Sequence, residues 1–145
     1  MKIRPPSTMH EYAEYYEKRW ALLRKPWSEP RGSEKDNLEQ ESYHVIAIEE
    51  SNIIGGGRIH FNSASEAQVR YMFVLPEHQG RGIGKEILSA LESYALSQKA
   101  KVIKLNSREN AIPFYERQGY QVSGESPKLF GIIAHKRMQK SIWVK

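Results

Sequence analysis

A glycine-rich stretch, Gln79-Gly80-Arg81-Gly82-Ile83-Gly84-Lys85, holds the residues of this sequence that are best suited to bind an anion. It follows an apolar segment that ends at Leu75, and it opens a segment with helical periodicity. Glycines allow the backbone to aim successive N–H groups at one point, and a helix start adds about half a positive charge there. The side chains of Arg81 and Lys85 either add further charge or are simply solvated. The stretch therefore predicts a cradle for an anion such as a pyrophosphate.

Two familiar phosphate-binding motifs do not fit these residues. The Walker motif requires Gly-Lys followed by Ser or Thr, whereas Gly84-Lys85 is followed by Glu86. The dinucleotide fingerprint G-x-G-x-x-G requires one more residue than Gly82-Ile83-Gly84 provides between its last two glycines. The sequence thus disfavours a nucleoside triphosphatase and a Rossmann dehydrogenase.

The composition narrows the chemistry further. The 145 residues include no cysteine, which excludes a disulfide scaffold, a thiolate metal site and an intermediate held on an enzyme thiol. Histidines and carboxylates show no metal-ligand spacing, so we expect no metal. The formal net charge of +5 favours anionic partners. Because basic residues are interspersed with glutamate instead of forming a stripe, we expect no nucleic-acid partner.

The length and the N-terminal segment set the expected organisation. A chain of 145 residues has room for one ordinary domain, which we expect to cover residues 1–145. No run approaches the ~20 apolar residues of a membrane span, and Met1 to Pro6 lacks the apolar core of a signal peptide. We therefore expect a cytoplasmic protein with no membrane partner.

Hydrophobic periodicity predicts the elements that position the cradle. Helices are expected at 8–24, 84–97 and 111–118, the first burying Tyr12, Tyr16, Trp20 and Leu23, the last capped by Asn110. Strands are expected at 43–48, 53–61, 67–75, 101–105, 120–124 and 129–138. The helix between strands 67–75 and 101–105 forms a crossover, which makes these two strands parallel. The pattern predicts an α/β (α+β) domain with one mixed sheet.

The stretch Gln79 to Gly84 matches the pattern (Q/R)-x-x-G-x-(G/A), and with it the chain resembles the GCN5-related N-acetyltransferase (GNAT) superfamily. Val74-Leu75-Pro76 and the segments 105–111 and 114–120 resemble the family in order and spacing, so the resemblance covers about residues 69–122. Segments 19–26, 57–58 and 131–135, together with Met138, resemble the branch that includes the acetyltransferase half of acetyltransferase–thioesterase fusions. The resemblance implies a GNAT fold, with a mostly antiparallel sheet, a splayed parallel strand pair and about four flanking helices.

The resemblance also implies an acyltransferase that uses acetyl-CoA and no metal. Pantetheine would bind the backbone of Phe73 and Val74, with the Val74 N–H facing the thioester carbonyl. Tyr115 matches the tyrosine that in many members donates a proton to the departing thiolate. The pyrophosphate would lie over residues 79–85, where the implied contacts are Gln79, Gly80, Arg81, Gly82, Gly84 and Lys85.

One position departs from the family pattern. Many relatives carry a coenzyme-contacting asparagine seven residues before the tyrosine, where this chain has Arg108. Asn106 and Asn110 flank that position, so it stays open which of them, if either, makes the asparagine contact. For Asn110 the alternative role is a helix cap, and for Arg108 it is a contact with a coenzyme phosphate.

The acceptor side is less determined. An amine attacks as the free base, so its ammonium must lose a proton to a carboxylate, an imidazole or water. Glu41, His44, His60 and His135 are the candidate side chains. Without cysteine, we expect direct attack of a primary amine on acetyl-CoA in a ternary complex. Basic residues near Arg24 suggest an acidic or phosphorylated acceptor, or only a solvated surface. The alternative function is a catalytically idle acyl-CoA-binding regulatory module, and a homodimer is possible.

Overall fold

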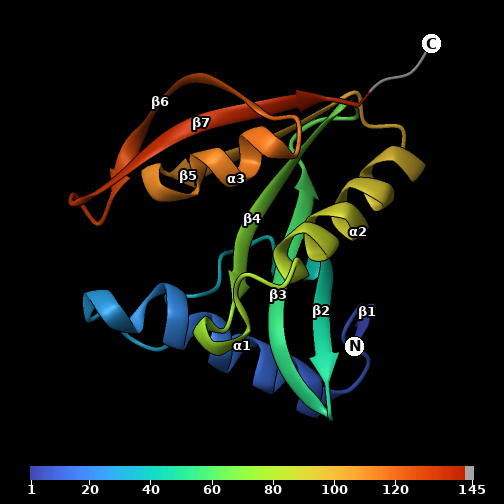
Figure 1. The fold of residues 1–145 in the computed structure, drawn as a ribbon, viewed down its shortest axis with the longest axis vertical. Helices are drawn as coiled ribbons and strands as arrows, with labels where there is room; N and C mark the ends of the chain where they lie inside the picture. The colour runs from blue at the N-terminus through green and yellow to red at the C-terminus, as the bar shows by residue number, and fades with distance from the viewer. Residues whose placement is uncertain (143–145) are drawn as a thin grey trace.

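The computed structural model describes residues 1–142, which form seven strands in one sheet and three α-helices (Figure 1). The strands are β1 (Lys2–Arg4), β2 (Tyr43–Glu49), β3 (Asn52–Phe61), β4 (Glu66–Val74), β5 (Val102–Arg108), β6 (Gln121–Leu129) and β7 (Ile133–Ser141), in the spatial order β1-β2-β3-β4-β5-β7-β6. The helices are α1 (Met9–Leu23), α2 (Ile83–Ser97) and α3 (Ile112–Arg117), and four short 3-10 helices join them. The β4–β5 pair is parallel and the other pairs of the described sheet are antiparallel, which confirms the expected mixed sheet.

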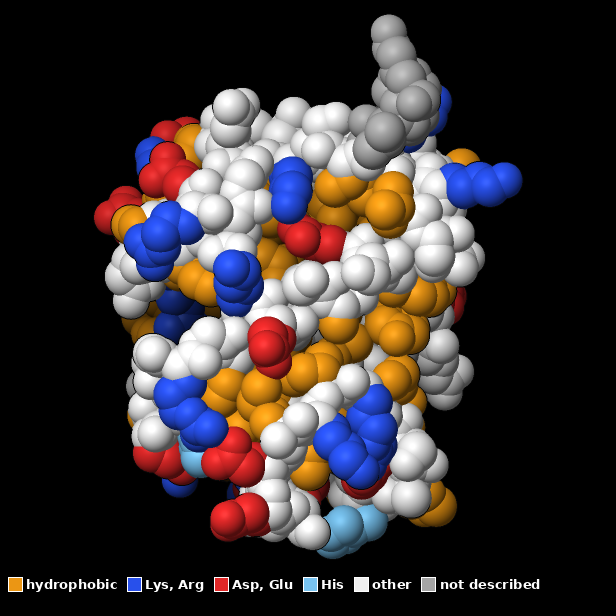
Figure 2. Space-filling view, turned by 45° about the vertical axis from the view of Figure 1, so that its right-hand side comes forward, with side chains coloured by type: hydrophobic (Ala, Val, Ile, Leu, Met, Phe, Trp, Pro, Cys, Tyr) orange, Lys and Arg blue, Asp and Glu red, His pale blue; other side chains and the backbone are white. Residues whose placement is uncertain are grey.

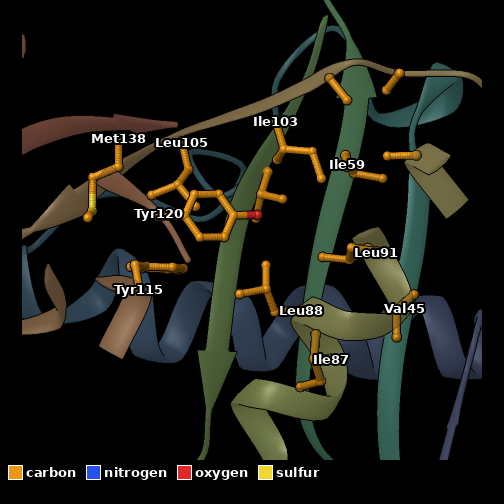
Figure 3. Close-up of a cluster of buried hydrophobic side chains, with 14 of the residues drawn as sticks. Val45, Ile59, Ile87, Leu88, Leu91, Ile103, Leu105, Tyr115, Tyr120 and Met138 are labelled. Carbon is orange, nitrogen blue, oxygen red and sulfur yellow. The ribbon is translucent and has the colours of Figure 1, made fainter. Parts of the chain in front are cut away.

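Helices α1 and α2 cover opposite faces of this sheet, and three glycines of β3 let them come close. A Cβ on Gly56 would lie 2.7 Å from the Tyr15 ring of α1, and one on Gly57 would lie 3.2 Å from Leu91 of α2. Successive residues of a strand point to opposite faces, so the two contacts lie on the two sides of β3. The larger core lies on the α2 face and includes Val45, Ile59, Ile87, Leu88, Leu91, Ile103, Leu105, Tyr115, Tyr120 and Met138 (Figure 3).

Three local predictions were wrong. Helix α1 buries Tyr15 and Arg19 and exposes Tyr12, because its inner face meets a buried network of charged groups and not only apolar side chains. Asn110 does not cap α3: it lies inside the 3-10 helix Glu109–Ala111, and the cap position, Ala111, makes no side-chain hydrogen bond. The final strand begins at Ile133 and not at 129, because positive φ angles at Phe130 and Gly131 form the hairpin turn there.

The parallel pair β4–β5 separates along its length. Its ladder pairs only Glu66 to Gln68 of β4 with Val102 to Lys104 of β5. Beyond these residues β4 continues beside β3 and β5 continues beside β7, so the two strands diverge, as Figure 1 shows. We call the resulting gap between Val69–Val74 and Leu105–Arg108 the split. It leaves backbone groups on the β5 side of β4 without a strand partner.

A β-bulge bends β4 beside the split. The register passes from Gly56↔Phe73 to Arg58↔Arg70, so Tyr71 and Met72 together lie opposite Gly57. Tyr71 has a φ of 60°, a left-handed conformation that a bulky residue rarely adopts. The bulge therefore holds the Tyr71 ring in an orientation that a regular strand would not give it.

Candidate active site

The end of β4 presents Val74 to the split. The Leu75 N–H donates to the Ile54 carbonyl at 2.8 Å, so the backbone of Leu75 faces β3. Because backbone groups alternate along an antiparallel strand, the N–H and C=O of Val74 face away from β3. The Gln79 side chain, which donates to the Val74 carbonyl at 3.0 Å, agrees with this orientation. By the same alternation the backbone of Phe73 faces β3, and its side chain is buried.

The glycine-rich stretch joins β4 to α2, and two of its glycines have the conformation that a cradle requires. Gly80 and Gly82 have φ angles of 80° and 81°, and a Cβ at either position would meet no atom within 4 Å. Gly82 caps α2 without a side-chain bond, and the first N–H groups of a helix have no acceptor within the helix. Gly84 lies in the first turn of α2 and needs no unusual φ. The cradle therefore depends on Gly80 and Gly82.

The charged side chains of the cradle differ in what surrounds them. Arg81 donates to Glu49 at 2.8 Å and also contacts Nδ1 of His78, so part of its charge is neutralised. Lys85 is exposed in the first turn of α2. The Arg81 N–H belongs to the turn that leads into α2, and the Lys85 N–H belongs to the first turn of the helix, whatever their side chains contact.

Tyr115 lies on α3, beside the far end of the cradle. The position of a Cβ on Gly84 is 3.5 Å from the Phe114 ring and 3.8 Å from Val74, so α3 packs against the start of α2. The Tyr115 ring packs edge-on against Phe114 and Tyr120, among the core residues of Figure 3. Burial raises the pKa of Tyr115 to about 12, so its hydroxyl keeps its proton at neutral pH.

The two faces of β5 carry different residues. Ile103, Leu105 and Ser107 are buried on the side of the core, so the alternation places Asn106 and Arg108 on the α1 side. Asn106 is exposed. The Arg108 guanidinium lies 4.4 Å from the centre of the Trp27 ring, which follows α1 in the 3-10 helix Lys25–Trp27. Arg108 therefore lies on the opposite side of the sheet from α2.

The four candidate bases are placed very differently. His44 contacts the Tyr15 hydroxyl at 2.9 Å and the Glu39 carbonyl at 2.8 Å, so both its ring nitrogens are engaged. His60 is likewise held by Arg58 and Asn62. Burial lowers the pKa of both histidines, and the charge of Arg58 lowers the pKa of His60 further. Glu41 is exposed in the 3-10 helix Glu39–Glu41.

His135 is the candidate that keeps a nitrogen for proton transfer. Its Nδ1 lies 2.9 Å from the Ile133 carbonyl, which can only accept, so Nδ1–H is the donor and Nε2 is the acceptor in the neutral form of the ring. His135 lies directly opposite Arg108 on the neighbouring strand. Directly opposed residues share a face of the sheet, so His135 also lies on the α1 side.

A buried network of charged side chains on the α1 side was not predicted from the sequence. Arg19 and Arg58 are fully buried, and they share Glu39 at 3.0 and 2.8 Å. Arg58 and Arg70 also share Asp36. Burial favours the neutral acid, but hydrogen bonds and charge from Arg58 outweigh it and hold the pKa of Asp36 below its usual range. The network fixes the loop between α1 and β2 against β3 and β4.

Comparison with known proteins agrees with this architecture. The sequence profile of the acetyltransferase (GNAT) family matches residues 9–120. The chain belongs to the GNAT family. An uncharacterized N-acetyltransferase of Bacillus subtilis, YjcF, is 33% identical over 111 residues, which cover 77% of this chain and 79% of the relative. As a GNAT member the chain is an acyltransferase, and its cosubstrate is acetyl-CoA.

Solved structures of GNAT enzymes share the fold. An aminoglycoside 6'-N-acetyltransferase complexed with coenzyme A superposes with a TM-score of 0.86 at 16% identity, covering 100% of this chain and 99% of the other. A GNAT acetyltransferase from Staphylococcus aureus gives a TM-score of 0.80 at 18% identity, covering 98% and 99%. The GNAT fold was therefore predicted correctly from the sequence motifs.

Residues 1–142 contain no group of three or more His, Asp or Glu side chains placed to share a metal ion. None of the helices in this range has the length and apolar character needed to span a membrane. On the face drawn in Figure 2, Lys and Arg side chains alternate with Asp and Glu, and apolar patches lie between them.

Proposed function

We propose that this GNAT domain, over residues 1–145, transfers the acetyl group of acetyl-CoA to a primary amine by direct attack in a ternary complex. The observation that carries the proposal is the split in the sheet, with the Val74 N–H turned into it and the cradle at its end. A thioester carbonyl placed in the split would accept from the Val74 N–H, where negative charge develops during attack. The acceptor would approach from the α1 side.

The residues of the donor side fit acetyl-CoA. Backbone N–H groups of residues 80–85 would hold the pyrophosphate, because Gly80 and Gly82 have the left-handed conformation and α2 begins there. The unpaired edge of β4 would bind pantetheine, chiefly through Val74 and not through Phe73, whose backbone faces β3. Asn106 stays a proposed contact from the α1 side. When bound, acetyl-CoA supplies an acyl carbon activated by its thiol leaving group.

Two side chains would move protons. Tyr115 would donate its hydroxyl proton to the departing thiolate, and its raised pKa keeps that proton available. A thiol titrates near 8.5, so its thiolate is a tolerable leaving group and the acid supplies only part of the acceleration. His135 Nε2 would accept the ammonium proton of the acceptor, directly or through water, because His44 and His60 have both nitrogens engaged.

Calorimetry followed by kinetics tests the proposal. Acetyl-CoA should bind with micromolar affinity, and a Gly80→Trp, Gly82→Trp double variant should lose binding because the side chains fill the cradle. Amino acids, polyamines and peptides would then be screened as acceptors, and initial velocities measured at varied concentrations of both substrates. Intersecting lines are expected for a ternary complex. Parallel lines, or an acetylated enzyme seen by intact mass spectrometry, would overturn direct attack, and absence of binding at millimolar acetyl-CoA would overturn the donor site.

A further inference from the structure

Two arginines on the α1 side, Arg24 and Arg108, have no acidic partner in the part of the chain that the structure describes. Within residues 1–142 no carboxylate lies within 4.0 Å of either guanidinium, whereas Arg19, Arg58 and Arg70 nearby are paired with Asp36 or Glu39. Arg24 is only 6% exposed, and it donates hydrogen bonds to the neutral carbonyls of Ser33 and Leu23, both at 2.9 Å. Positive charge is therefore left uncompensated at this place.

Both cations are desolvated and close to other cations. Burial lowers the pKa of Arg24; Tyr71 opposes this shift, and the charges of Arg70 and Arg19 add to it. Burial also lowers the pKa of Arg108, and the charge of Arg24 lowers it further. Holding like charges together away from water is unfavourable, and a bound anion would relieve that cost.

Aromatic rings give the two cations a shaped setting. The Arg108 guanidinium lies 4.4 Å from the centre of the Trp27 ring, and that of Arg24 lies 5.2 Å from the centre of the Phe130 ring. The two rings are 6.3 Å apart and come from the segment after α1 and from the β6–β7 turn. Stacking on rings fixes the plane of each guanidinium while its N–H groups stay in that plane. Such a plane suits a carboxylate or a phosphate.

This cationic pair lies at the edge of the split. Arg108 ends β5, and the Arg24 guanidinium is 5.4 Å from the ring centre of Tyr71, the bulge residue of β4. His135 lies opposite Arg108 on β7. The cradle, in contrast, lies at the start of α2, on the other face of the sheet. An anion held by the pair would therefore belong to a molecule that enters from the α1 side.

We propose that Arg24 and Arg108 bind an oxyanion of the acceptor, so that the substrate is an amine that also carries a carboxylate or a phosphate. This inference rests on the proposed acetyl transfer and names the class of its acceptor. The rings of Trp27 and Phe130 would flank the anionic group, and the amine would extend toward Val74 and His135. An amine lacking the anion would leave the two cations unpaired.

The first test measures binding of inorganic phosphate by calorimetry to protein saturated with coenzyme A, which occupies the cradle. Arg108→Gln should weaken phosphate binding about tenfold, the usual effect of losing a charge-assisted hydrogen bond. Arg117→Gln, an exposed arginine at the end of α3, removes the same charge and should change nothing. Arg24→Gln should also weaken phosphate binding. Because Arg24 is buried, thermal melting must first show that the Arg24→Gln variant is folded. If that variant does not fold, the result for Arg108→Gln decides the test.

The second test compares matched acceptors with acetyl-CoA. The kcat/KM for β-alanine should exceed that for propylamine by about tenfold or more, and the kcat/KM for phosphoethanolamine should exceed that for ethanolamine by the same factor. The pair with the larger ratio of kcat/KM values identifies carboxylate or phosphate as the preferred anion. Arg108→Gln should abolish the preference and leave the KM for acetyl-CoA within twofold.

Three outcomes overturn the inference. They are equal phosphate binding by wild type and Arg108→Gln, no preference within either pair, or a rise in the KM for acetyl-CoA alone, which would assign Arg108 to a coenzyme phosphate. If the wild-type protein does not bind acetyl-CoA, the proposed acetyl transfer is wrong and the anion site stays to be tested by itself. Phosphate titrations of wild type and of Arg108→Gln, both without coenzyme A, then decide whether the anion site exists.

Discussion

Replacing Gly82 and Gly84 separately by alanine distinguishes the conformational role of a glycine from its place in a motif. Gly82 has a φ of 81°, which costs an L-residue roughly 1–2 kcal/mol. Alanine also lowers the conformational entropy of the unfolded chain, which stabilises the folded state by about 0.4–1 kcal/mol. Since a Cβ on Gly82 would meet no atom within 4 Å, no clash adds to this difference. Gly82→Ala should therefore lower the free energy of unfolding by about 1 kcal/mol.

Gly84→Ala should act in the opposite direction. Gly84 lies inside the first turn of α2 without a positive φ, and its Cβ would make ordinary contacts of 3.5 Å with Phe114 and 3.8 Å with Val74. Alanine is better than glycine in a helix by up to about 1 kcal/mol. For a chain of 145 residues the entropy of unfolding is about 0.3 kcal/mol/K, so each kcal/mol moves the Tm by about 3 °C.

The assay is thermal unfolding of both variants together with calorimetric titration by acetyl-CoA. Gly82→Ala should lower the Tm by about 3 °C. It should also weaken the binding of acetyl-CoA about tenfold, because alanine at position 82 would relax away from the positive φ and turn backbone N–H groups away from the pyrophosphate. Gly84→Ala should keep or raise the Tm and bind acetyl-CoA within threefold of wild type. The reverse ranking of the two variants, in stability or in affinity, would refute the assignment of the cradle to Gly80 and Gly82.

Three further predictions follow from the buried groups. Tyr115→Phe should lower kcat by about 10- to 100-fold with little change in the KM for acetyl-CoA. Because the pKa of Tyr115 is about 12, the wild-type rate should not fall through loss of this proton below pH 10. A variant as fast as wild type would exclude Tyr115 as the acid. Arg58→Met should destabilise the fold by about 3 kcal/mol in urea unfolding, because it leaves Asp36 and Glu39 with one arginine each; a loss below about 1 kcal/mol would contradict this. Burial lowers the pKa of His44 and His60, so below about pH 6.5 the unfolded chain binds protons that the folded chain does not. The free energy of unfolding should therefore fall as the pH drops below the ordinary histidine pKa of about 6.5. Between pH 7.5 and 5.5 the Tm of His44→Gln should fall less than that of wild type.

Much of the fold could be predicted because local signals agreed with one another. The apolar, β-branched residues of β2 and β3, the crossover through α2 and the glycine at 119, which has a φ of 94° after α3, are short-range patterns with direct geometric causes. The first strand, Lys2–Arg4, was missed because three residues carry too little periodicity. The buried face of α1 was misassigned because apolar spacing favoured Tyr12 and Tyr16, whereas buried Arg19 pairs with Glu39, 20 positions away in the sequence.

The candidate site divides in the same way. The cradle and Tyr115 belong to contiguous motifs, so their residues could be named before their positions were known. The backbone of Val74 faces away from β3 and that of Phe73 faces toward it, as the hydrogen bond between Leu75 and Ile54 shows. Both ring nitrogens of His44 are engaged by Tyr15 and Glu39, and those of His60 by Arg58 and Asn62. Ile54, Tyr15 and Glu39 come from other elements, so no spacing within one segment reveals them, whereas Arg58 and Asn62 lie only two residues from His60 along the chain.

The Tyr71 bulge links the two halves of the site. Guanidinium carbons of Arg19, Arg70, Arg58 and Arg24 lie 4.2, 4.5, 5.1 and 5.4 Å from the centre of its ring. The first three are paired with Asp36 or Glu39, so their contacts stabilise the bulge, whereas Arg24 has no acidic partner among the described residues and is proposed to bind a ligand. The same bulge bends β4 beside the split. The geometry that opens the proposed donor site therefore also positions Arg24 and Arg108, the cationic pair proposed to bind the acceptor. A substitution at Tyr71 should therefore impair donor and acceptor binding together, whereas substitutions at Arg108 or Gly82 should impair only one of them.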